Sequence, residues 1–198
     1  MRAVTICECW KRRVDLTRLG FSRAHAGAML SDYRCEPDVE KRFRMLRASR
    51  EFGGLLITGN PGSGKTRLLA ALCREYLLDG NSVEFTTSLK FFMRLRESYG
   101  ADGEEHESAV VARFCEVDFL ALDDLGREGK ITEHVLTFVY HILSARLDNY
   151  KPTAITTNLS FTEFARAYDA GIASRLGAYI PLALVARDRR NCLTEMAL

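Results

Sequence analysis

The sequence predicts an α/β protein in which helices cover both faces of a parallel β-sheet. Three observations lead to this fold class. Short apolar or β-branched runs alternate with longer helical patterns from residue 55 onward, and such alternation is typical of parallel sheets. A glycine-rich turn joins the first run to the first long helix. The 198 residues are 47% hydrophobic and 27% charged, which fits a folded domain and excludes a disordered or collagen-like chain.

Five runs are expected to be strands. The first, Leu55 to Thr58, leads into the glycine-rich turn, and the third ends in two aspartates. Strands of a parallel sheet are buried on both faces, so they read as continuous apolar runs instead of alternating ones. The expected strands are residues 55–58, 83–86, 117–122, 153–157 and 180–185.

The segments between these runs are expected to be helices. The helix after the glycine-rich turn ends at the breaker Asp79-Gly80-Asn81, and Ser88 is the expected N-cap of the next helix. The longest helix places six apolar residues at spacings of three and four, as one buried face requires. The expected helices are residues 65–78, 88–99, 109–115, 132–149, 162–168 and 171–176, with a polar, acidic loop at 100–108.

Residues 1–50 have no strand pattern, and 15–30 and 38–50 are expected to be two basic helices. The segment holds twelve lysines and arginines against six acidic residues, a net charge of +6, whereas the remainder carries −4. A basic arm on an acidic body points to nucleic acid, and the alternative is ordinary solvated helix faces. The predicted organisation is a basic helical arm at 1–50, a main domain at 51–190 and a tail at 191–198.

Cysteine usage and hydropathy bear on the cellular compartment. Cys73 and Cys115 lie inside apolar patterns and are expected to be buried thiols and not disulfide partners. No apolar run approaches the ~18 residues that a membrane helix needs. The first ten residues lack the apolar core of a secretory signal. A cytoplasmic location without membrane contact is therefore expected.

The glycine-rich turn matches a phosphate-binding loop. Gly59-Asn60-Pro61-Gly62-Ser63-Gly64-Lys65-Thr66 fits G-x-x-x-x-G-K-[ST] between a strand and a helix. Glycines let backbone N–H groups converge on phosphate oxygens, and the helix N-terminus favours an anion. Lys65 is expected at the β- and γ-phosphates and the Thr66 hydroxyl on Mg²⁺. These eight residues and Arg67 are the expected nucleotide contacts; a chance glycine turn is disfavoured by the strand and helix on either side.

The third expected strand ends in Asp123-Asp124. A carboxylate at the C-terminal end of a strand beside a phosphate loop can hold the shell of a magnesium ion. We assign that role to Asp123, and the role of general base for the attacking water to Asp124. The alternative is a strand that ends in an Asx turn.

Two further polar positions are candidates. Asn158 ends the fourth expected strand and is positioned to orient a water near the γ-phosphate, the alternative being a turn that caps the next helix. Arg175 follows a short helical pattern and is a candidate arginine finger for a neighbouring subunit, the alternative being a surface salt bridge. Arg187, Arg189 and Arg190 follow the last strand, either near the phosphates or in a solvated tail.

Four of these segments occur in the order used by AAA+ ATPases: the phosphate loop, LALDDLG (120–126), TTNLS (156–160) and ASRL (173–176). Over roughly residues 30–190 the sequence resembles the bacterial helicase loaders similar to DnaC, together with the IstB-like transposition helper ATPases. The paired aspartates followed by Leu-Gly, and the ending VARDRR (185–190), are similar to that group.

The resemblance implies ATP and Mg²⁺ as ligands and a five-stranded parallel sheet of order 5-1-4-3-2 without a C-terminal helical lid. It implies that Lys65 and Thr66 are Walker A residues and that Asp123 and Asp124 form the Walker B pair. The remaining implied roles are sensor 1 for Asn158, a trans arginine finger for Arg175 and a terminal arginine near the nucleotide for Arg190.

The resemblance also implies partners. The helical pair at 88–99 and 107–115 would contact single-stranded DNA through Lys90, Arg94 and Arg96, whereas Phe91 and Phe92 are expected in the core. Cys7-Glu8-Cys9 looks like half of a zinc module that Cys35 or His25 would have to complete, at poor spacing.

The favoured function is an ATP-hydrolysing AAA+ protein that assembles as a homo-oligomer on single-stranded DNA and loads or recruits a replicative helicase. A second interpretation is an IstB-like scaffold that binds ATP on DNA and guides a transposase. A third, a small-molecule nucleotide kinase, fits the size and the phosphate loop but leaves Asn158 and Arg175 without a role.

Overall fold

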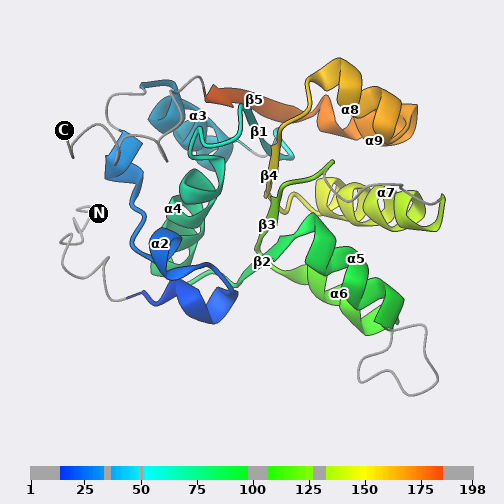
Figure 1. Cartoon of the computed structure of the whole chain (residues 1–198), viewed down its shortest axis with the longest axis horizontal. Coiled ribbons are helices and arrows are strands. Elements are labelled where there is room, and N and C mark those ends of the chain that lie inside the picture. Colours follow the sequence, from blue (N-terminus) through cyan, green and yellow to red (C-terminus); the bar gives the residue numbers. More distant parts are fainter. Residues whose placement is uncertain (1–13, 34–36, 50, 98–106, 127–132, 185–198) are drawn as a thin grey trace, which may run out of the picture.

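A computed structural model describes residues 14–33, 37–49, 51–97, 107–126 and 133–184. Its centre is a parallel sheet of five strands in the order β2-β3-β4-β1-β5, which confirms the expected order read from the opposite edge (Figure 1). The strands are β1 (Gly54–Gly59), β2 (Val83–Thr87), β3 (Phe119–Asp123), β4 (Thr153–Thr157) and β5 (Tyr179–Leu184). Each lies within two residues of the expected segment.

Helices cover both faces of the sheet (Figure 1). One face carries α2 (Arg23–Ala26), α3 (Pro37–Ala48) and α4 (Lys65–Leu78). The other carries α5 (Ser88–Glu97), α6 (Glu107–Glu116), α7 (Glu133–Asp148), α8 (Phe161–Ala167) and α9 (Ala170–Leu176). The expected helices at 65–78, 88–99, 109–115, 132–149, 162–168 and 171–176 are confirmed within the described residues. Among those residues, no helix is long and apolar enough to cross a bilayer.

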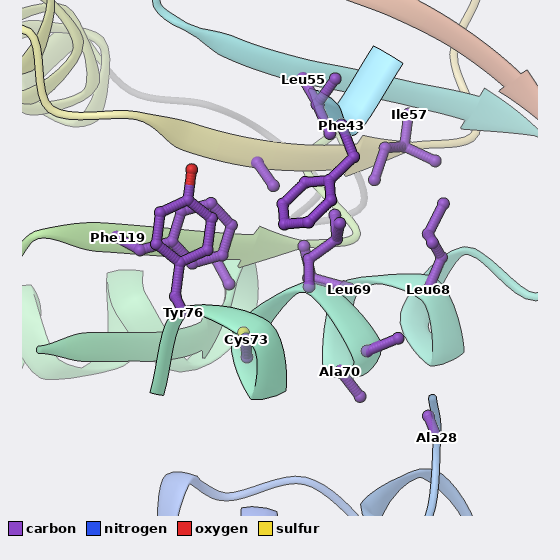
Figure 2. Close-up of a cluster of buried hydrophobic side chains, with 14 of the residues drawn as sticks. Ala28, Phe43, Leu55, Ile57, Leu68, Leu69, Ala70, Cys73, Tyr76 and Phe119 are labelled. Atoms are coloured by element: carbon purple, nitrogen blue, oxygen red, sulfur yellow. The ribbon is translucent and has the colours of Figure 1, made fainter. Parts of the chain in front are cut away.

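The alternation of side chains along each strand produces two cores. Leu55 and Ile57 of β1 pack under α4, whereas Leu56 between them packs against the helices of the opposite face. Figure 2 shows the first core, where the rings of Tyr76 from α4 and Phe119 from β3 stack with centroids 4.0 Å apart. Both cores consist of buried apolar side chains, and their burial is the main force that holds the helices to the sheet.

The predicted burial holds for Phe91, Phe92 and Cys73 and only in part for Cys115. Phe91 and Phe92 are 3% and 4% exposed and belong to the second core, as expected. Cys73 is a buried free thiol, and burial raises its pKa. Cys115 is also free and is half-buried. Cys7, Cys9 and Cys35 lie outside the described residues.

The N-terminal segment differs from expectation. Residues 15–30 do not form one helix but three separate turns: η1 (Leu16–Leu19), α2 and η2 (Leu30–Tyr33). Gly20 ends η1 in a left-handed conformation at φ 99°, and Ser22 is extended, so the helical path is broken twice. The second expected helix, 38–50, corresponds to α3.

These turns pack onto the main core. Leu16, Phe21 and Tyr33 are buried in the same cluster as β1 and α4. The guanidinium of Arg74, on α4, is 2% exposed and donates to the backbone carbonyls of residues 14, 26 and 28, the first at 3.1 Å and the last at 2.9 Å. The boundary at residue 50 stays a prediction, but side chains on both sides of it share one core.

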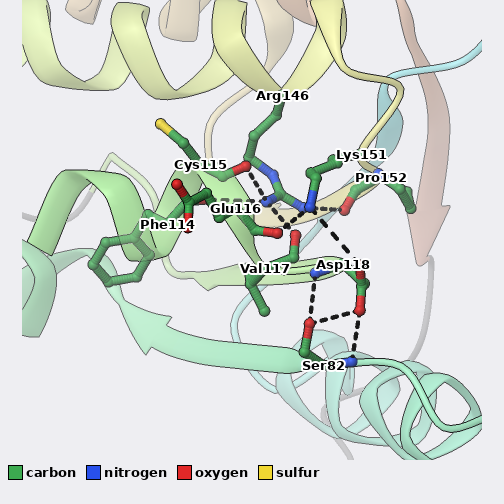
Figure 3. Close-up of polar contacts among 9 residues, drawn as sticks. All are labelled: Ser82, Phe114, Cys115, Glu116, Val117, Asp118, Arg146, Lys151 and Pro152. Atoms are coloured by element: carbon green, nitrogen blue, oxygen red, sulfur yellow. Dashed lines mark hydrogen bonds and ion pairs between the residues drawn. The ribbon is translucent and has the colours of Figure 1, made fainter. Parts of the chain in front are cut away.

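A second buried arginine, Arg146, lies at the starts of β3 and β4 (Figure 3). Arg146 of α7 is fully buried, and its Nε donates to Thr153 Oγ1 at 2.8 Å. Its two Nη atoms donate to the backbone carbonyls of Phe114 at 2.9 Å, Val117 at 2.8 Å and Pro152 at 2.8 Å. Burial lowers the pKa of Arg146 to about 10, so the guanidinium stays charged at neutral pH. It joins the end of α6 to the starts of β3 and β4.

An exposed corner beside Arg146 is held by Ser82 and Asp118. The Ser82 hydroxyl and N–H donate to Asp118 Oδ2 at 2.6 and 2.9 Å, and the Asp118 N–H donates back to Ser82 Oγ at 3.0 Å. The hydrogen bonds from Ser82 hold the pKa of Asp118 below its ordinary value of 3.8. The pair fixes the start of β2 against the start of β3.

Candidate nucleotide-binding site

A pocket of about 540 Å³ lies where β1, β3 and β4 end. Its walls come from four segments: the glycine-rich loop with the start of α4, the turn after β3, the turn after β4, and α2. The carboxyl ends of parallel strands are the usual ligand site of an open α/β sheet. Asp123 lies 57 residues beyond Thr66 in the sequence, and Asn158 lies 92 residues beyond it. The fold therefore brings these separate motifs to the same edge of the sheet.

The glycine-rich loop is shaped as a cradle. A Cβ on Gly59 would lie 2.5 Å from the carbonyl oxygen of Leu184 and 2.8 Å from Ser63 Oγ, so only glycine fits. Gly64, at φ 96°, starts α4 in the left-handed conformation that glycine tolerates. Lys65 lies inside the loop, and its Nζ donates to the carbonyls of Gly59 at 2.8 Å and Asn60 at 2.9 Å. The cradle, the cation and the N-terminus of a 14-residue helix fit a bound phosphate chain.

The acidic group and the helix meet at one point. Thr66 Oγ1 lies 3.0 Å from Asp123 Oδ2, and Thr156 Oγ1 donates to Asp123 Oδ1 at 2.6 Å. Asp123 is only 3% exposed. Burial raises its pKa, against the opposing effect of the hydrogen bonds from Thr156 and Thr66. A threonine hydroxyl beside a carboxylate is an oxygen donor set of the kind Mg²⁺ takes together with phosphate oxygens.

Asp124 has an unusual backbone. It adopts φ 57°, a left-handed conformation that is uncommon for a residue with a side chain. Its N–H donates to Thr156 Oγ1 at 2.8 Å, and its carbonyl accepts from Ser88 Oγ at 2.9 Å. Ser88 is therefore not the N-cap of α5 as expected: its hydroxyl is used across the sheet, and Thr87 Oγ1 accepts the Lys90 N–H at 3.3 Å instead. Asp124 lines the pocket, and the contacts on both sides of it hold it there.

Asn158 is exposed and lines the same pocket. It does not cap the following helix, because Ser160 does: the Ser160 hydroxyl accepts from the Glu163 N–H, and the Glu163 carboxylate accepts from the Ser160 N–H. The turn that follows β4 therefore does cap the next helix, but through Ser160 and not through Asn158 itself. Its amide is available to a ligand in the pocket.

Arg175 lies away from this pocket, on α9. Its guanidinium carbon is 3.8 Å from the ring centroid of Tyr140, within cation–π range. Nε donates to Ser144 Oγ, one Nη to the Tyr140 hydroxyl, and the other to the Gly171 carbonyl at 3.4 Å. The structure places Arg175 against α7, outside the lining of the pocket.

The sequence reasoning missed the wall supplied by α2. Ala24 and His25 line the pocket, and the Tyr33 hydroxyl donates to the Gly64 carbonyl at 2.9 Å. Arg67, an expected nucleotide contact, lines the pocket and also pairs with Asp32 at 2.8 Å. No motif marks these N-terminal residues; only the packing onto α4 brings them here.

The expected DNA contacts are separate from the pocket. Lys90 and Arg94 are exposed on α5, and Arg94 also lies 3.3 Å from the carboxylate of Glu84. The side chain of Arg96 and all of Arg190, the expected terminal arginine, lie outside the described residues.

The sheet order, the phosphate loop before α4 and the aspartates at the end of β3 define a P-loop nucleotide-binding protein with the AAA+ fold. The chain belongs to the family of IstB-like ATP binding proteins, whose model matches residues 11–176.

Relatives and solved structures agree with this assignment. The chain is 24% identical to the replicative helicase loader DnaC of Escherichia coli K12 over 172 residues, 84% of this chain and 69% of DnaC. It is 30% identical to the uncharacterized protein YdaV of the same strain over 155 residues, 74% of this chain and 60% of YdaV.

Two solved structures share the fold over nearly their whole length. The crystal structure of DnaI matches with a TM-score of 0.70 at 25% identity, covering 86% of this chain and 94% of DnaI. That of the DnaC helicase loader matches with a TM-score of 0.67 at 22% identity, covering 84% of this chain and 100% of the other. AMPPCP-bound DnaA from Aquifex aeolicus matches with a TM-score of 0.65 at 20% identity, over 84% of this chain and 52% of DnaA.

Proposed function

We propose that this protein binds ATP with Mg²⁺, hydrolyses it between subunits, and uses the cycle to load or recruit a replicative helicase on single-stranded DNA. The observation that carries the hydrolysis part is that Thr66 and Asp124 both line the pocket and that the Thr66 hydroxyl contacts the carboxylate of Asp123. Membership of an ATP-binding family supports the nucleotide. Similarity to DnaC supports the helicase as partner. A cytoplasmic location belongs to this proposal.

The residues divide the chemistry between them. The loop amides and Lys65 hold the phosphates, and Thr66 and Asp123 would hold Mg²⁺, which draws charge from the β- and γ-phosphates when it is bound. Asp124 accepts a proton from the attacking water, and Asn158 orients that water from the other side of the pocket. The protein contributes to catalysis by positioning the reactants and by stabilising charge, as is general for phosphoryl transfer.

Hydrolysis needs a second subunit in this proposal. Arg175 faces α7 of its own chain, so its guanidinium is offered to the pocket of a neighbour and not to its own. An arginine finger is worth ~10³–10⁵ in rate. The isolated subunit should accordingly be almost inactive, and the rate per subunit should rise with protein concentration.

The DNA contact is proposed for α5. Lys90 and Arg94 form a basic row on its exposed side, beside the exposed apolar pair Leu89 (59% exposed) and Met93 (48% exposed). Basic side chains such as these track a phosphate backbone. Binding of this kind weakens as salt rises, because counterions are released on association.

The test mixes two inactive variants. Lys65→Ala cannot hold the phosphates but keeps the finger, and Arg175→Ala keeps the pocket but lacks the finger. ATP turnover is measured for each alone and for an equimolar mixture, with and without single-stranded DNA at two salt concentrations. We expect the mixture to recover ATP turnover. Single-stranded DNA should raise this turnover, and by less at high salt than at low salt. Full turnover by Arg175→Ala alone would overturn the shared site.

The family name favours a second candidate, an IstB-like helper that guides a transposase on DNA. The ATP chemistry is then the same and only the partner differs. ATP-dependent capture of a purified replicative helicase supports loading, and capture of a transposase in its place supports the helper.

A further inference from the structure

Thr156 lies where the two aspartates of the site meet. It is the fourth residue of β4, it is fully buried, and it faces the end of β3. Its hydroxyl is 2.6 Å from Asp123 Oδ1 and 2.8 Å from the Asp124 nitrogen. The backbone carbonyl of Thr156 accepts the N–H of Leu125, the residue after Asp124, at 2.9 Å. Thr156 therefore contacts three consecutive residues, the last residue of β3 and the first two of the turn that follows.

The direction of these hydrogen bonds is fixed by chemistry. The Asp124 N–H can only donate, so it uses a lone pair of the Thr156 hydroxyl. The single hydroxyl proton is then directed at Asp123, whose ionised carboxylate can only accept. Thr66 Oγ1 lies 3.0 Å from Oδ2 and 3.2 Å from Oδ1. Because Thr156 holds Oδ1, the oxygen that remains for the cation beside Thr66 is Oδ2. The hydroxyl thus sets the rotation of the carboxylate that would face the cation.

The same hydroxyl steadies Asp124. That residue has a left-handed backbone at φ 57°, which a residue with a side chain adopts only when its surroundings hold it there. The N–H is held by Thr156 and the carbonyl by Ser88. Loss of the Thr156 hydroxyl would release one of these two contacts and let the aspartate turn away from the pocket.

We propose that Thr156 is a positioning residue that orients Asp123 toward the hydrated divalent cation and holds Asp124 at the pocket wall. This deepens the proposed function and rests on it. Partners that orient a metal ligand commonly account for 10–100-fold in metal affinity or activity. Thr156→Val, which keeps the shape of the side chain and removes the hydroxyl, should lower kcat and raise the Mg²⁺ concentration needed for half-maximal rate, each by about 10-fold or more.

The experiment compares Thr156→Val with Thr156→Ser, which keeps the hydroxyl, and with Thr86→Val. Thr86 is a matched control: it is 2% exposed, lies on β2, and its hydroxyl donates to the Thr87 carbonyl and not to an aspartate. For each protein we would measure the Mg²⁺ dependence of ATP turnover, the affinity for a fluorescent ATP analogue with Mg²⁺ and with EDTA, and the thermal melt.

The expected result has three parts. Thr156→Val loses turnover and the Mg²⁺-dependent gain in nucleotide affinity, but binds the analogue in EDTA as the original protein does. Thr156→Ser and Thr86→Val stay within about twofold of the original in each, well inside the 10-fold effect expected of the hydroxyl. Unchanged Mg²⁺ dependence in Thr156→Val, or its loss in Thr156→Ser, would overturn the proposal. If Thr156→Val fails to fold, Thr156→Ala takes its place with the same expectations.

Failure of the proposed function would look different. An original protein that binds the analogue more tightly with Mg²⁺ but never hydrolyses ATP would refute hydrolysis. The role of Thr156 toward the cation would still be decided by the binding measurement.

Discussion

Replacing Arg146 by methionine tests the buried guanidinium at the start of β3 and β4. The change keeps an unbranched side chain of similar length and removes every donor. Five acceptors then lose a hydrogen bond: Thr153 Oγ1 and the carbonyls of Phe114, Cys115, Val117 and Pro152. Of these, the Pro152 carbonyl still accepts the Leu120 N–H at 3.3 Å. Each buried polar group left without a hydrogen bond costs ~1–3 kcal/mol.

The net cost is smaller than the sum, because water can enter and methionine packs well. Replacing both members of a buried ion pair by apolar residues can be nearly neutral, since no charge or acceptor is left behind. Here the acceptors are mainly backbone carbonyls, which no substitution removes. We therefore expect a loss of about 3–5 kcal/mol, below the sum of ~1–3 kcal/mol for each acceptor left without a hydrogen bond. That is a large share of the ~5–15 kcal/mol that stabilises a typical domain.

Equilibrium unfolding in urea, followed by far-ultraviolet circular dichroism, measures this loss directly. Arg44→Met is the matched control, because Arg44 is a surface arginine of α3 whose side chain is 76% exposed. Within the described part of the chain its ion pair is with Glu40, one turn away. The control should change the free energy of unfolding by less than ~0.5 kcal/mol. An Arg146→Met protein within about 1 kcal/mol of the original would show that its hydrogen bonds are replaced by water at no cost, against the usual penalty.

Two further predictions concern the corner at β2 and the loop. Asp118→Asn should remove a contribution to stability that depends on pH. Ser82 lowers the pKa of the folded Asp118 carboxylate below its ordinary value of 3.8, so the original protein should be more stable than the variant near pH 6. This difference in stability should shrink as the pH falls through 3.8 toward the lower pKa of the folded state. Urea midpoints between pH 3 and 6 measure this, and a gap that does not change with pH would contradict it. Gly59→Ala should lower nucleotide affinity at least 10-fold, because its Cβ would lie 2.5 Å from a backbone oxygen in a loop that must hold its shape around the phosphates. Gly80→Ala is the control, since that glycine also has a positive φ, of 82°, but nothing lies within 4 Å of the added atom; equal losses of affinity in both would contradict the cradle.

Local pattern predicted most of the fold. The strands and the helices after residue 51 follow from alternation of apolar runs and helical spacing, which are properties of neighbouring residues. The strand order needed the resemblance, because nothing in a single strand says which other strand it pairs with. The turns of residues 16–33 were missed, since Gly20 and Ser22 interrupt a pattern that otherwise reads as a helix.

The site residues that belong to a sequence motif were predicted, whereas those that reach the site only through packing of distant segments were missed. Lys65, Thr66 and Asp123 belong to motifs with fixed spacing, and the structure brings them together. Thr156 and His25 carry no such mark. Thr156 reads as an ordinary β-branched strand residue, and its contacts lie 32 and 33 residues away in the sequence. Which buried hydroxyl faces which carboxylate is decided only by the register of β3 and β4.

The grip of Arg74 on the N-terminal turns has a practical consequence for how the protein can be divided. By its sequence pattern, a fragment that starts at residue 51 would contain the whole predicted nucleotide-binding domain. It would uncover the side of α4 on which Leu16, Phe21 and Tyr33 lie. It would also remove the carbonyls of residues 14, 26 and 28, to which the buried guanidinium of Arg74 donates. Such a fragment should aggregate during expression, and weak nucleotide binding by it would reflect a missing wall and not a wrong motif.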